Sequence, residues 1–354
     1  METATPRLEL CGMTKIYPSV IANDSIDLKV FPGEIHAVLG ENGAGKSTLM
    51  KAIYGVVKPD RGDILWEGRQ IDIINPAHAR KLGIGMVFQH FSLFETLTVV
   101  ENIALAMEDK TDMETLSLKI IDVSEKYGLS LDPRRLVHSL PVGLRQRVEI
   151  VRCLIQKPKL LIMDEPTSVL TPQAVRKMFE TLRKLSQEGC SILYISHKLD
   201  EIKELCHKAT IIRAGKVTGT ALPANETPSS LARMMIGKEL PVCTQNNPDL
   251  NGDKCLEVSC LCKPKSDQFG TDLNNISLTV HSGEILGIAG ISGNGQRELI
   301  NAVVGEWLTE KPEDIRICGK HVGHMDTGKR RKMGLGFVPE DRLGRGAVPG
   351  MNLM

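Results

Sequence analysis

The chain has 354 residues, of which 42% are apolar, and its 44 Lys and Arg against 43 Asp and Glu give a net charge of +1. This length allows two domains with hydrophobic cores of ordinary size. The balanced charge gives no electrostatic reason to expect nucleic acid or an anionic membrane surface as a partner, so neither is predicted.

The N-terminus and the cysteines indicate a protein that is not secreted. Residues 1–6 lack the pattern of a signal peptide, and no apolar run approaches the ~20 residues of a bilayer span. The nine cysteines are scattered, apart from Cys260 and Cys262, which predicts reduced thiols in a cytosol. A metal site that adds Cys255 to this pair is disfavoured, because the paired spacing of zinc ligands is missing. Any membrane association is expected to go through a partner.

The first predicted site follows a predicted strand at 35–39. That apolar run leads into the segment Gly40-Glu41-Asn42-Gly43-Ala44-Gly45-Lys46-Ser47-Thr48. The pattern is typical of a phosphate-binding loop, in which backbone N–H groups converge on phosphates. We expect Lys46 to contact the β- and γ-phosphates and Ser47 to reach Mg²⁺, with a helix beginning near Lys46. Gly40, Asn42, Gly43, Gly45 and Thr48 complete the predicted nucleotide-binding set; a glycine turn without a ligand is the disfavoured alternative.

Two further segments follow in the first half of the chain. Gln89 comes directly after a predicted strand at 84–88, and it is a candidate to bridge the metal or the attacking water to the next loop. A polar surface position is the alternative for this glutamine. Residues 139–149 then predict a turn followed by a helix that is rich in Arg and Val.

The apolar run 159–163 ends in two carboxylates, Asp164 and Glu165. Such a run predicts a buried parallel strand whose carboxyl end faces a ligand. Because side chains alternate along a strand, we expect Asp164 to hold Mg²⁺ and Glu165 to approach the attacking water as general base. A solvated turn is the alternative for an Asp-Glu pair.

A helix at 172–187 and a second buried strand at 190–196 lead to His197. Its position after that strand favours contact with a γ-phosphate over the structural role that a single histidine usually has.

The chain also repeats itself. Residues 25–35 recur at 275–285 with an offset of 250, and 81–89 recur at 332–340 with an offset of 251. Two related modules are therefore predicted at 1–240 and 255–354, with a polar linker at 241–254. A complete second copy would run to about residue 490, so the second module is expected to be incomplete and poorly packed from about Asn301 onward.

Together these motifs resemble the nucleotide-binding subunit of an ABC transporter. The resemblance rests on the phosphate loop, Gln89, the turn before the helix near 142, the Asp164-Glu165 strand, residues 168–171 and His197. Gly293-Asn294-Gly295-Gln296 in the second copy and Pro339-Glu340-Asp341-Arg342 look like the simple-sugar and nucleoside importer ATPases. Phe88-Gln89-His90-Phe91 and Val169-Leu170-Thr171-Pro172-Gln173 look more like the nucleoside, or basic-membrane-protein-associated, branch.

The resemblance implies an α/β fold of the P-loop NTPase type and the ABC class, with tandem modules of which the second is incomplete. It implies ATP and Mg²⁺ as cofactors, Tyr17 stacked on adenine, and Gln89 coupling the site to transmembrane permease subunits. An external substrate-binding protein would take part indirectly. The expected place is the cytoplasmic face of the cell membrane, as a peripheral subunit.

The chain departs from the family pattern at one composite site. Pro141 and Leu144 replace the serine and glutamine of the Leu-Ser-Gly-Gly-Gln signature, while Gln296 and Arg297 replace the lysine and serine of the second loop. Pro141 offers neither a hydroxyl nor an N–H group. That site is therefore predicted to hold nucleotide poorly, and the intact first loop lacks a partner signature. A truncated gene product, a complete module in trans and a homodimer remain open.

The motifs predict an ATPase that energises import of a nucleoside or simple sugar. Two alternatives stay open: a catalytically silent remnant or regulatory subunit, and an ABC protein of translation or repair. The last would be expected to carry a basic patch or a long inserted arm, and neither is visible in the sequence.

Overall fold

The computed structural model describes residues 5–88, 91–107, 112–168, 170–237, 252–265, 270–290 and 294–339, together with 346 and 351. The chain divides into two compact units, Met1–Pro241 (the first unit) and Val242–Met354 (the second unit).

The first unit alternates strands and helices. Its strands are β1 (Leu8–Tyr17), β2 (Val20–Val30), β3 (Ile35–Leu39), β4 (Arg61–Trp66), β5 (Arg69–Ile71), β6 (Ile84–Val87), β7 (Leu160–Asp164), β8 (Ser191–Ile195), β9 (Lys208–Arg213) and β10 (Lys216–Ala221). Its α-helices are α1 (Lys46–Ile53), α2 (Pro76–Lys81), α3 (Val99–Ala104), α4 (Met113–Lys126), α5 (Val142–Leu154), α6 (Pro172–Gln187), α7 (Leu199–Leu205) and α8 (Pro228–Ile236).

A six-stranded sheet forms the centre of the first unit, in the order β10-β9-β3-β8-β7-β6. All neighbouring pairs are parallel except β9 and β10. Strands β3, β7 and β8 are buried along their whole length, which explains why they read as continuous apolar runs. Because these three strands are parallel, their carboxyl ends meet at one edge of the sheet.

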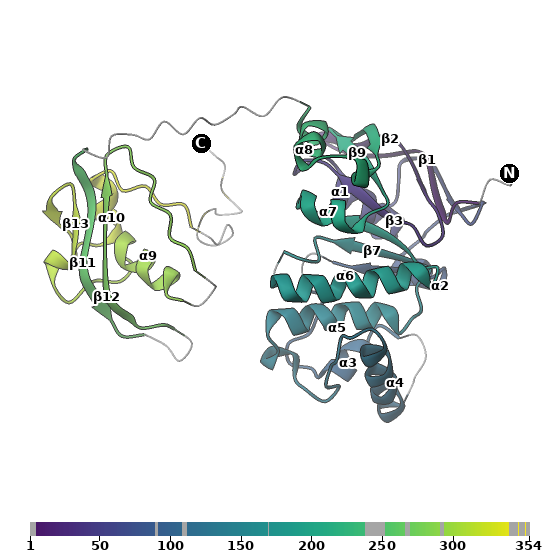
Figure 1. Ribbon diagram of the computed structural model, residues 1–354, viewed down its shortest axis with the longest axis horizontal. Coiled ribbons are helices and arrows are strands. Elements are labelled where there is room, and N and C mark those ends of the chain that lie inside the picture. The colour runs from purple at the N-terminus through teal and green to yellow at the C-terminus, as the bar shows by residue number, and fades with distance from the viewer. Residues whose placement is uncertain are drawn as a thin grey trace. The chain divides into compact units, whose positions relative to one another are not determined.

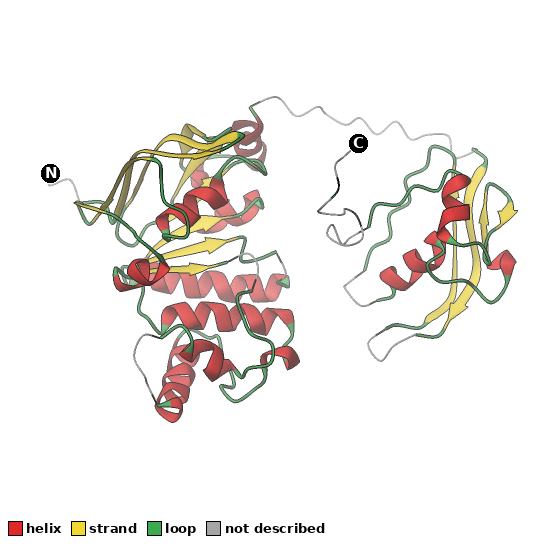
Figure 2. Cartoon of the chain, turned by 180° about the vertical axis from the view of Figure 1, so that it is seen from behind, coloured by secondary structure: helices red, strands yellow, loops and turns green. Residues whose placement is uncertain are grey.

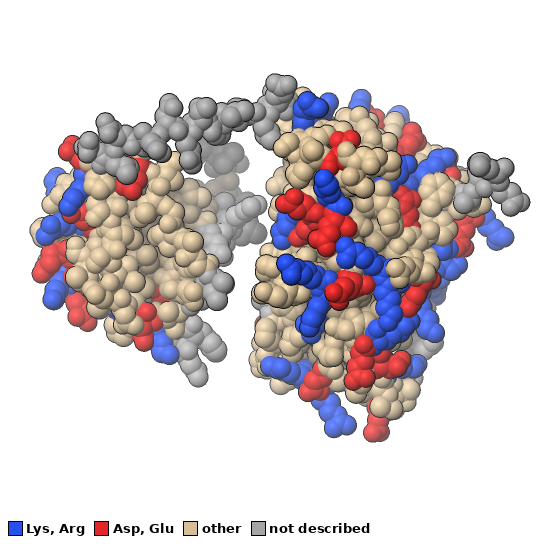
Figure 3. All heavy atoms as spheres, viewed as in Figure 1, with Lys and Arg blue, Asp and Glu red and all other residues tan. Residues whose placement is uncertain are grey.

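Both faces of this sheet are covered (Figure 1). One face packs against α1 and a four-stranded antiparallel sheet ordered β2-β1-β4-β5, with Val38, Ile162 and Leu193 contributed by the central strands. The other face packs against α3 to α6, with Leu39, Met163 and Tyr194 facing that layer. The alternation of side chains along each strand thus supplies two separate cores. On the surface of the first unit seen in Figure 3, acidic and basic side chains lie beside one another.

The second unit is built on a four-stranded antiparallel sheet ordered β12-β11-β13-β14 (Figure 2). Its strands are β11 (Lys254–Lys263), β12 (Leu273–His281), β13 (Ile315–Ile317) and β14 (Lys320–His321), and its helices are α9 (Gln296–Val304) and α10 (Thr327–Lys332). Leu299, Ala302 and Val303 of α9 pack with Val258 and Leu261 of the sheet.

For residues 301–333, the prediction that packing fails from about Asn301 onward was wrong. Asn301 itself is 6% exposed, and Ile315, Ile317 and Val322 are buried in the core of the second unit. The reason is that β13 pairs with β11, so this stretch completes an antiparallel sheet that needs no central parallel strand.

The repeated segments nevertheless adopt different structures in the two units. Residues 285–290 match the strand β3 in sequence, yet they form no strand, and Ile285 is 98% exposed. Likewise residues 335–338 match β6 but form no strand, and Val338 is 92% exposed.

No helix within the described residues combines the length and the apolar character that a membrane span requires.

Candidate nucleotide-binding and hydrolysis site

The loop after β3 is shaped by two glycines that have no room for a side chain. A Cβ on Gly40 would lie 2.2 Å from the Ile212 carbonyl oxygen, and one on Gly45 would lie 2.1 Å from the Ala22 oxygen. Gly45 also has a φ of +100° and is the N-cap of α1. Glycine is therefore required where the loop passes the neighbouring strands and turns into the helix.

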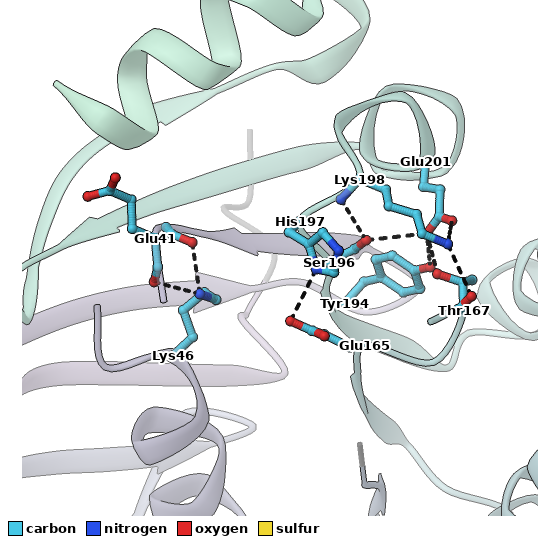
Figure 4. Close-up of polar contacts among 10 residues, drawn as sticks. Glu41, Lys46, Glu165, Thr167, Tyr194, Ser196, His197, Lys198 and Glu201 are labelled. Carbon is cyan, nitrogen blue, oxygen red and sulfur yellow. Dashed lines mark hydrogen bonds and ion pairs between the residues drawn. The ribbon is translucent and has the colours of Figure 1, made fainter. Parts of the chain in front are cut away.

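Lys46 begins α1 and folds back over this loop. Its Nζ donates hydrogen bonds to the carbonyl oxygens of Gly40 at 2.8 Å and Glu41 at 2.9 Å (Figure 4). The residue is only 8% exposed. Burial lowers the pKa of Lys46, and the negative charges of Glu165 and Asp164 oppose that effect. The ammonium thus lies at the loop, between carbonyl oxygens and the two acidic residues.

Asp164 lies at the carboxyl end of β7, beside the same loop. It is 6% exposed, and the Ser47 side chain lies near it. Burial, and then the charge of Glu165, raises the pKa of Asp164, while Ser47 and Lys46 act in the opposite direction. A carboxylate and a hydroxyl near one another are oxygen ligands of the kind that Mg²⁺ takes in phosphate-binding sites, so the residues fit that ion.

Glu165 and His197 lie together beyond the strand ends. Their side chains are 3.3 Å apart, between Glu165 Oε1 and His197 Nδ1, and the Glu165 side chain is 16% exposed (Figure 4). The prediction that strand alternation directs Glu165 was wrong, because β7 ends at Asp164 and Glu165 has a φ of +48°. This left-handed residue leaves the strand path, while its N–H group remains bonded to the Ile195 oxygen at 3.0 Å.

Two residues near this site were missed by the sequence analysis. Asn23 of β2 is fully buried, and its Nδ2 donates to the Gly45 oxygen at 3.2 Å. Glu201 of α7 accepts from Thr167, Tyr194 and Ser196 next to the Glu165 and His197 pair. A polar residue at an inward strand position could have indicated Asn23, whereas Glu201 has the pattern of an ordinary acidic residue in a first helical turn.

The other described residues that were predicted to contact the nucleotide are exposed or half-buried. Tyr17 ends β1, is 37% exposed, and has Lys15 Nζ 5.6 Å from its ring centre. No hydrogen bond or ring contact between described residues joins it to the loop. Asn42 and Gly43 are exposed and Thr48 is half-buried in the first turn of α1. Gln89, predicted as a catalytic and metal-binding residue, lies outside the described residues.

The turn before α5 contains Pro141, where the sequence analysis found a departure from the family signature. Pro141 is the N-cap of α5 and makes no side-chain capping hydrogen bond. Arg145 instead donates from Nε to the Leu140 oxygen at 3.0 Å. The turn is thus stabilised from within the helix.

The second unit contains a related loop end. Gly295 has a φ of +95° and caps α9, as Gly45 caps α1. A Cβ on Gly290 would lie 2.3 Å from the Gln296 amide nitrogen, so the Gln296 side chain lies beside Gly290. A left-handed glycine thus caps the helix in both units, although Gln296 carries no charge where Lys46 does.

A glycine-rich loop between a central parallel strand and a helix, with acidic residues at the end of a neighbouring strand, defines a P-loop nucleotide-binding protein. The ABC transporter family model matches residues 23–168. The nucleoside import ATP-binding protein NupA of Lactococcus lactis subsp. cremoris (strain MG1363) is 40% identical over 346 residues, which cover 96% of this chain and 68% of that protein. The chain belongs to the ABC transporter family of ATP-binding proteins.

Two further relatives agree with this family. The ribose import ATP-binding protein RbsA 1 of Rubrobacter xylanophilus (strain DSM 9941 / JCM 11954 / NBRC 16129 / PRD-1) is 38% identical to this chain. The match covers 98% of this chain and 69% of that protein. The solved structure of cbiO1 from Clostridium perfringens, part of the ABC transporter complex cbiONQ, superposes with a TM-score of 0.55 and 29% identity. That match covers 62% of this chain and 89% of cbiO1.

Proposed function

We propose that the chain binds ATP with Mg²⁺ at the loop 40–48, hydrolyses it, and thereby energises import of a nucleoside or simple sugar through an ABC permease. The observation that carries this proposal is the convergence of Lys46, Asp164, Glu165 and His197 at the carboxyl edge of one parallel sheet.

Each residue has a role that its surroundings support. Lys46 and the backbone N–H groups at the start of α1 bind the phosphates, because positive charge and oriented N–H groups meet there. Ser47 and Asp164 would hold Mg²⁺, which when bound neutralises phosphate charge. Glu165 orients and deprotonates the attacking water, and His197, held by Glu165, contacts the γ-phosphate. Tyr17 offers an exposed ring on which adenine can stack.

A groove in the first unit suits contact with a permease. It has a volume of about 320 Å³ and borders Phe88, Phe94, Leu105 and Arg152. Phe94 and Leu105 are each 62% exposed, and apolar side chains that gather at one groove suit a protein contact. Gln89 directly follows Phe88, and we propose that it couples the nucleotide site to this contact.

Substrate and partners belong to the assembled transporter. NupA and RbsA 1 are named for nucleoside and ribose import, and this chain is similar to both. We therefore propose permease subunits as direct partners, an external substrate-binding protein as an indirect partner, and a peripheral position at the cytoplasmic face of the membrane.

Closure over ATP needs a second nucleotide-binding surface. The second unit, proposed as a related module, has Gln296 and Arg297 where Lys46 and Ser47 stand in the first. Glutamine carries no charge and Arg297 has no hydroxyl for a metal ion, so we propose that this loop binds nucleotide poorly. A homodimer or a complete module in trans would supply the surface that faces Lys46.

The Glu165→Gln variant tests the hydrolytic proposal. We expect Mg-ATP binding to be retained while the turnover rate falls by about 10²–10⁴-fold, because the general base is removed without loss of the phosphate ligands. Binding is followed by equilibrium titration with a fluorescent ATP analogue, and turnover by phosphate release from the full chain. Glu180→Gln, an exposed change on α6, is the matched control. Turnover in Glu165→Gln equal to that of the control would refute the assignment, and unchanged ATP binding in Lys46→Ala would refute the site itself.

A further inference from the structure

The carboxylate of Glu201 joins three segments that end at the proposed catalytic site. Its Oε2 accepts hydrogen bonds from the hydroxyls of Thr167 at 2.7 Å, Tyr194 at 2.9 Å and Ser196 at 3.3 Å. Thr167 lies in the loop after β7, Tyr194 and Ser196 lie at the end of β8, and Glu201 reaches them from α7 (Figure 4). One side chain therefore cross-links a loop, a strand end and a helix.

The charge of Glu201 is balanced within this cluster. Lys198 Nζ lies 3.2 Å from Glu201 Oε1 and also donates to the Thr167 carbonyl oxygen at 3.1 Å. The backbone N–H of Lys198 donates to Ser196 Oγ at 3.0 Å. The Glu201 side chain is only 11% exposed, so donors from the protein replace much of its hydration. A simple surface ion pair with Lys198 would not require three hydroxyls to converge on one oxygen.

The cluster lies directly beside the proposed catalytic pair. Thr167 follows Glu165 by two residues, and Ser196 immediately precedes His197. Glu165 has a left-handed backbone, which a neighbouring structure must hold in place. The bonds of Glu201 fix the chain on both sides of the 3.3 Å contact between Glu165 and His197.

We infer that Glu201 is a positioning residue, which holds the Glu165 loop and the His197 segment in the geometry needed for hydrolysis. This inference rests on the ATP hydrolysis proposed above. Glu201 acts through its hydroxyl partners, so its loss is expected to displace the catalytic side chains without removing any group that contacts the phosphates.

Hydrogen exchange in the full chain tests whether Glu201 holds these two segments in place, and this measurement does not require turnover. In Glu201→Ala we expect amides of residues 164–168 and 195–199 to exchange about tenfold faster or more, because charged hydrogen bonds that close this region are lost. Glu201→Gln should restore part of the protection, since its amide oxygen can still accept from the hydroxyls. Glu204→Ala, an exposed change on the same helix, is the matched control. Exchange that stays at the control level in both segments would overturn the inference. Thr167→Val removes one of the three donors with little change in volume, and it decides the same question if Glu201→Ala does not fold.

Kinetics then separate positioning from general stabilisation. We expect Glu201→Ala to lower kcat by about 10–100-fold while KM for ATP stays within about twofold, as displacement of reacting groups predicts. In a His197→Ala background the same change should cost less, because one of the two groups that Glu201 positions is gone. An equal loss in both backgrounds would contradict the inference that Glu201 positions His197. If the unaltered chain shows no hydrolysis above Lys46→Ala, the proposed function fails, and hydrogen exchange still decides the role of Glu201.

Discussion

Asp164 lies where its surroundings oppose its own charge. Burial and the nearby Glu165 carboxylate raise its pKa above the ordinary value of 3.8. Such an arrangement is typical of a ligand-binding site. The ionised carboxylate destabilises the folded protein in the absence of ligand, and a bound cation would offset that effect. Burial also disfavours the charged form of Lys46, because it lowers the pKa of this residue.

The Asp164→Asn variant should therefore be more stable than the unaltered protein in the absence of ligand. A raised pKa in the folded state means that Asp164 contributes stability below its unfolded pKa, and that this contribution is lost as pH rises through the folded value. Near neutral pH we expect Asn to raise Tm by about 2–4 °C, or about 1 kcal/mol, and the gain to shrink toward zero at about pH 4.

Unfolding of the first unit can be followed by the fluorescence of Trp66 in a Trp307→Phe background. The exposed change Asp122→Asn is the control, and it should leave Tm unchanged at every pH. A lower Tm for Asp164→Asn near neutral pH would contradict the expectation that the ionised Asp164 carboxylate destabilises the folded protein.

At the scale of single elements, the second unit depends on a buried arginine. Arg330 of α10 is fully buried, and its guanidinium donates to the carbonyl oxygens of Ala302 at 2.5 Å, Val303 at 2.7 Å, Met325 at 2.9 Å and Gly323 at 3.2 Å. Ala302 and Val303 lie in the last turn of α9, whose carbonyl groups have no partner within the helix. One side chain thus completes the end of α9 and joins it to α10.

Arg330→Ala should destabilise the second unit by about 3 kcal/mol, because several buried carbonyl oxygens would lose their donors together. The measurement is denaturant unfolding followed by Trp307 fluorescence in a Trp66→Phe background, so that only the second unit is reported. The neighbouring exposed residue supplies the control, and Arg331→Ala should change stability by less than about 0.5 kcal/mol. Equal effects of the two changes would show that the buried guanidinium is not needed.

At the scale of the whole molecule, the two units differ in how their cysteines are held. In the first unit Cys153, Cys190 and Cys206 are buried and Cys11 is half-buried. Burial raises the pKa of both Cys153 and Cys190 to about 12, and it also raises the pKa of Cys206. In the second unit Cys260, Cys262 and Cys318 are exposed and Cys255 is half-buried.

Alkylation with iodoacetamide at about pH 8 should therefore distinguish the buried thiols of the first unit from the exposed thiols of the second unit. The thiolate is the reacting form, so the exposed cysteines of the second unit should be modified in the native protein while the three buried thiols of the first unit are protected. Peptide mass spectrometry reads the extent at each site, and a denatured sample gives the level of full reaction. Rapid modification of Cys153 or Cys206 in native protein would indicate that the first unit opens far more readily than its core suggests.

Local patterns predicted much of the first unit. The strands at 35–39, 84–88 and 190–196 and the helix at 172–187 were expected, and β3, β6, β8 and α6 occupy those positions. These segments are apolar runs or amphipathic repeats bounded by Gly, Pro or polar residues. The spacing of their apolar residues therefore indicates directly whether each forms a strand or a helix. The contacts of Glu201 could not be predicted in this way, because they join side chains from three elements that only packing brings together.

By itself, the sequence determined which segments could form strands and which loop could bind phosphate, because side-chain period, glycine placement and the Lys46-Ser47 pair are local properties. Tertiary structure alone decided whether a capable segment became a strand. Residues 35–39 are buried as β3 because β8 and β9 pair with both of its edges. The related residues 285–290 form no strand and are exposed, since no strand among the described residues of the second unit pairs with them. A parallel strand gains its stability from backbone hydrogen bonds and burial that neighbouring strands supply, so its sequence permits the structure without being sufficient for it.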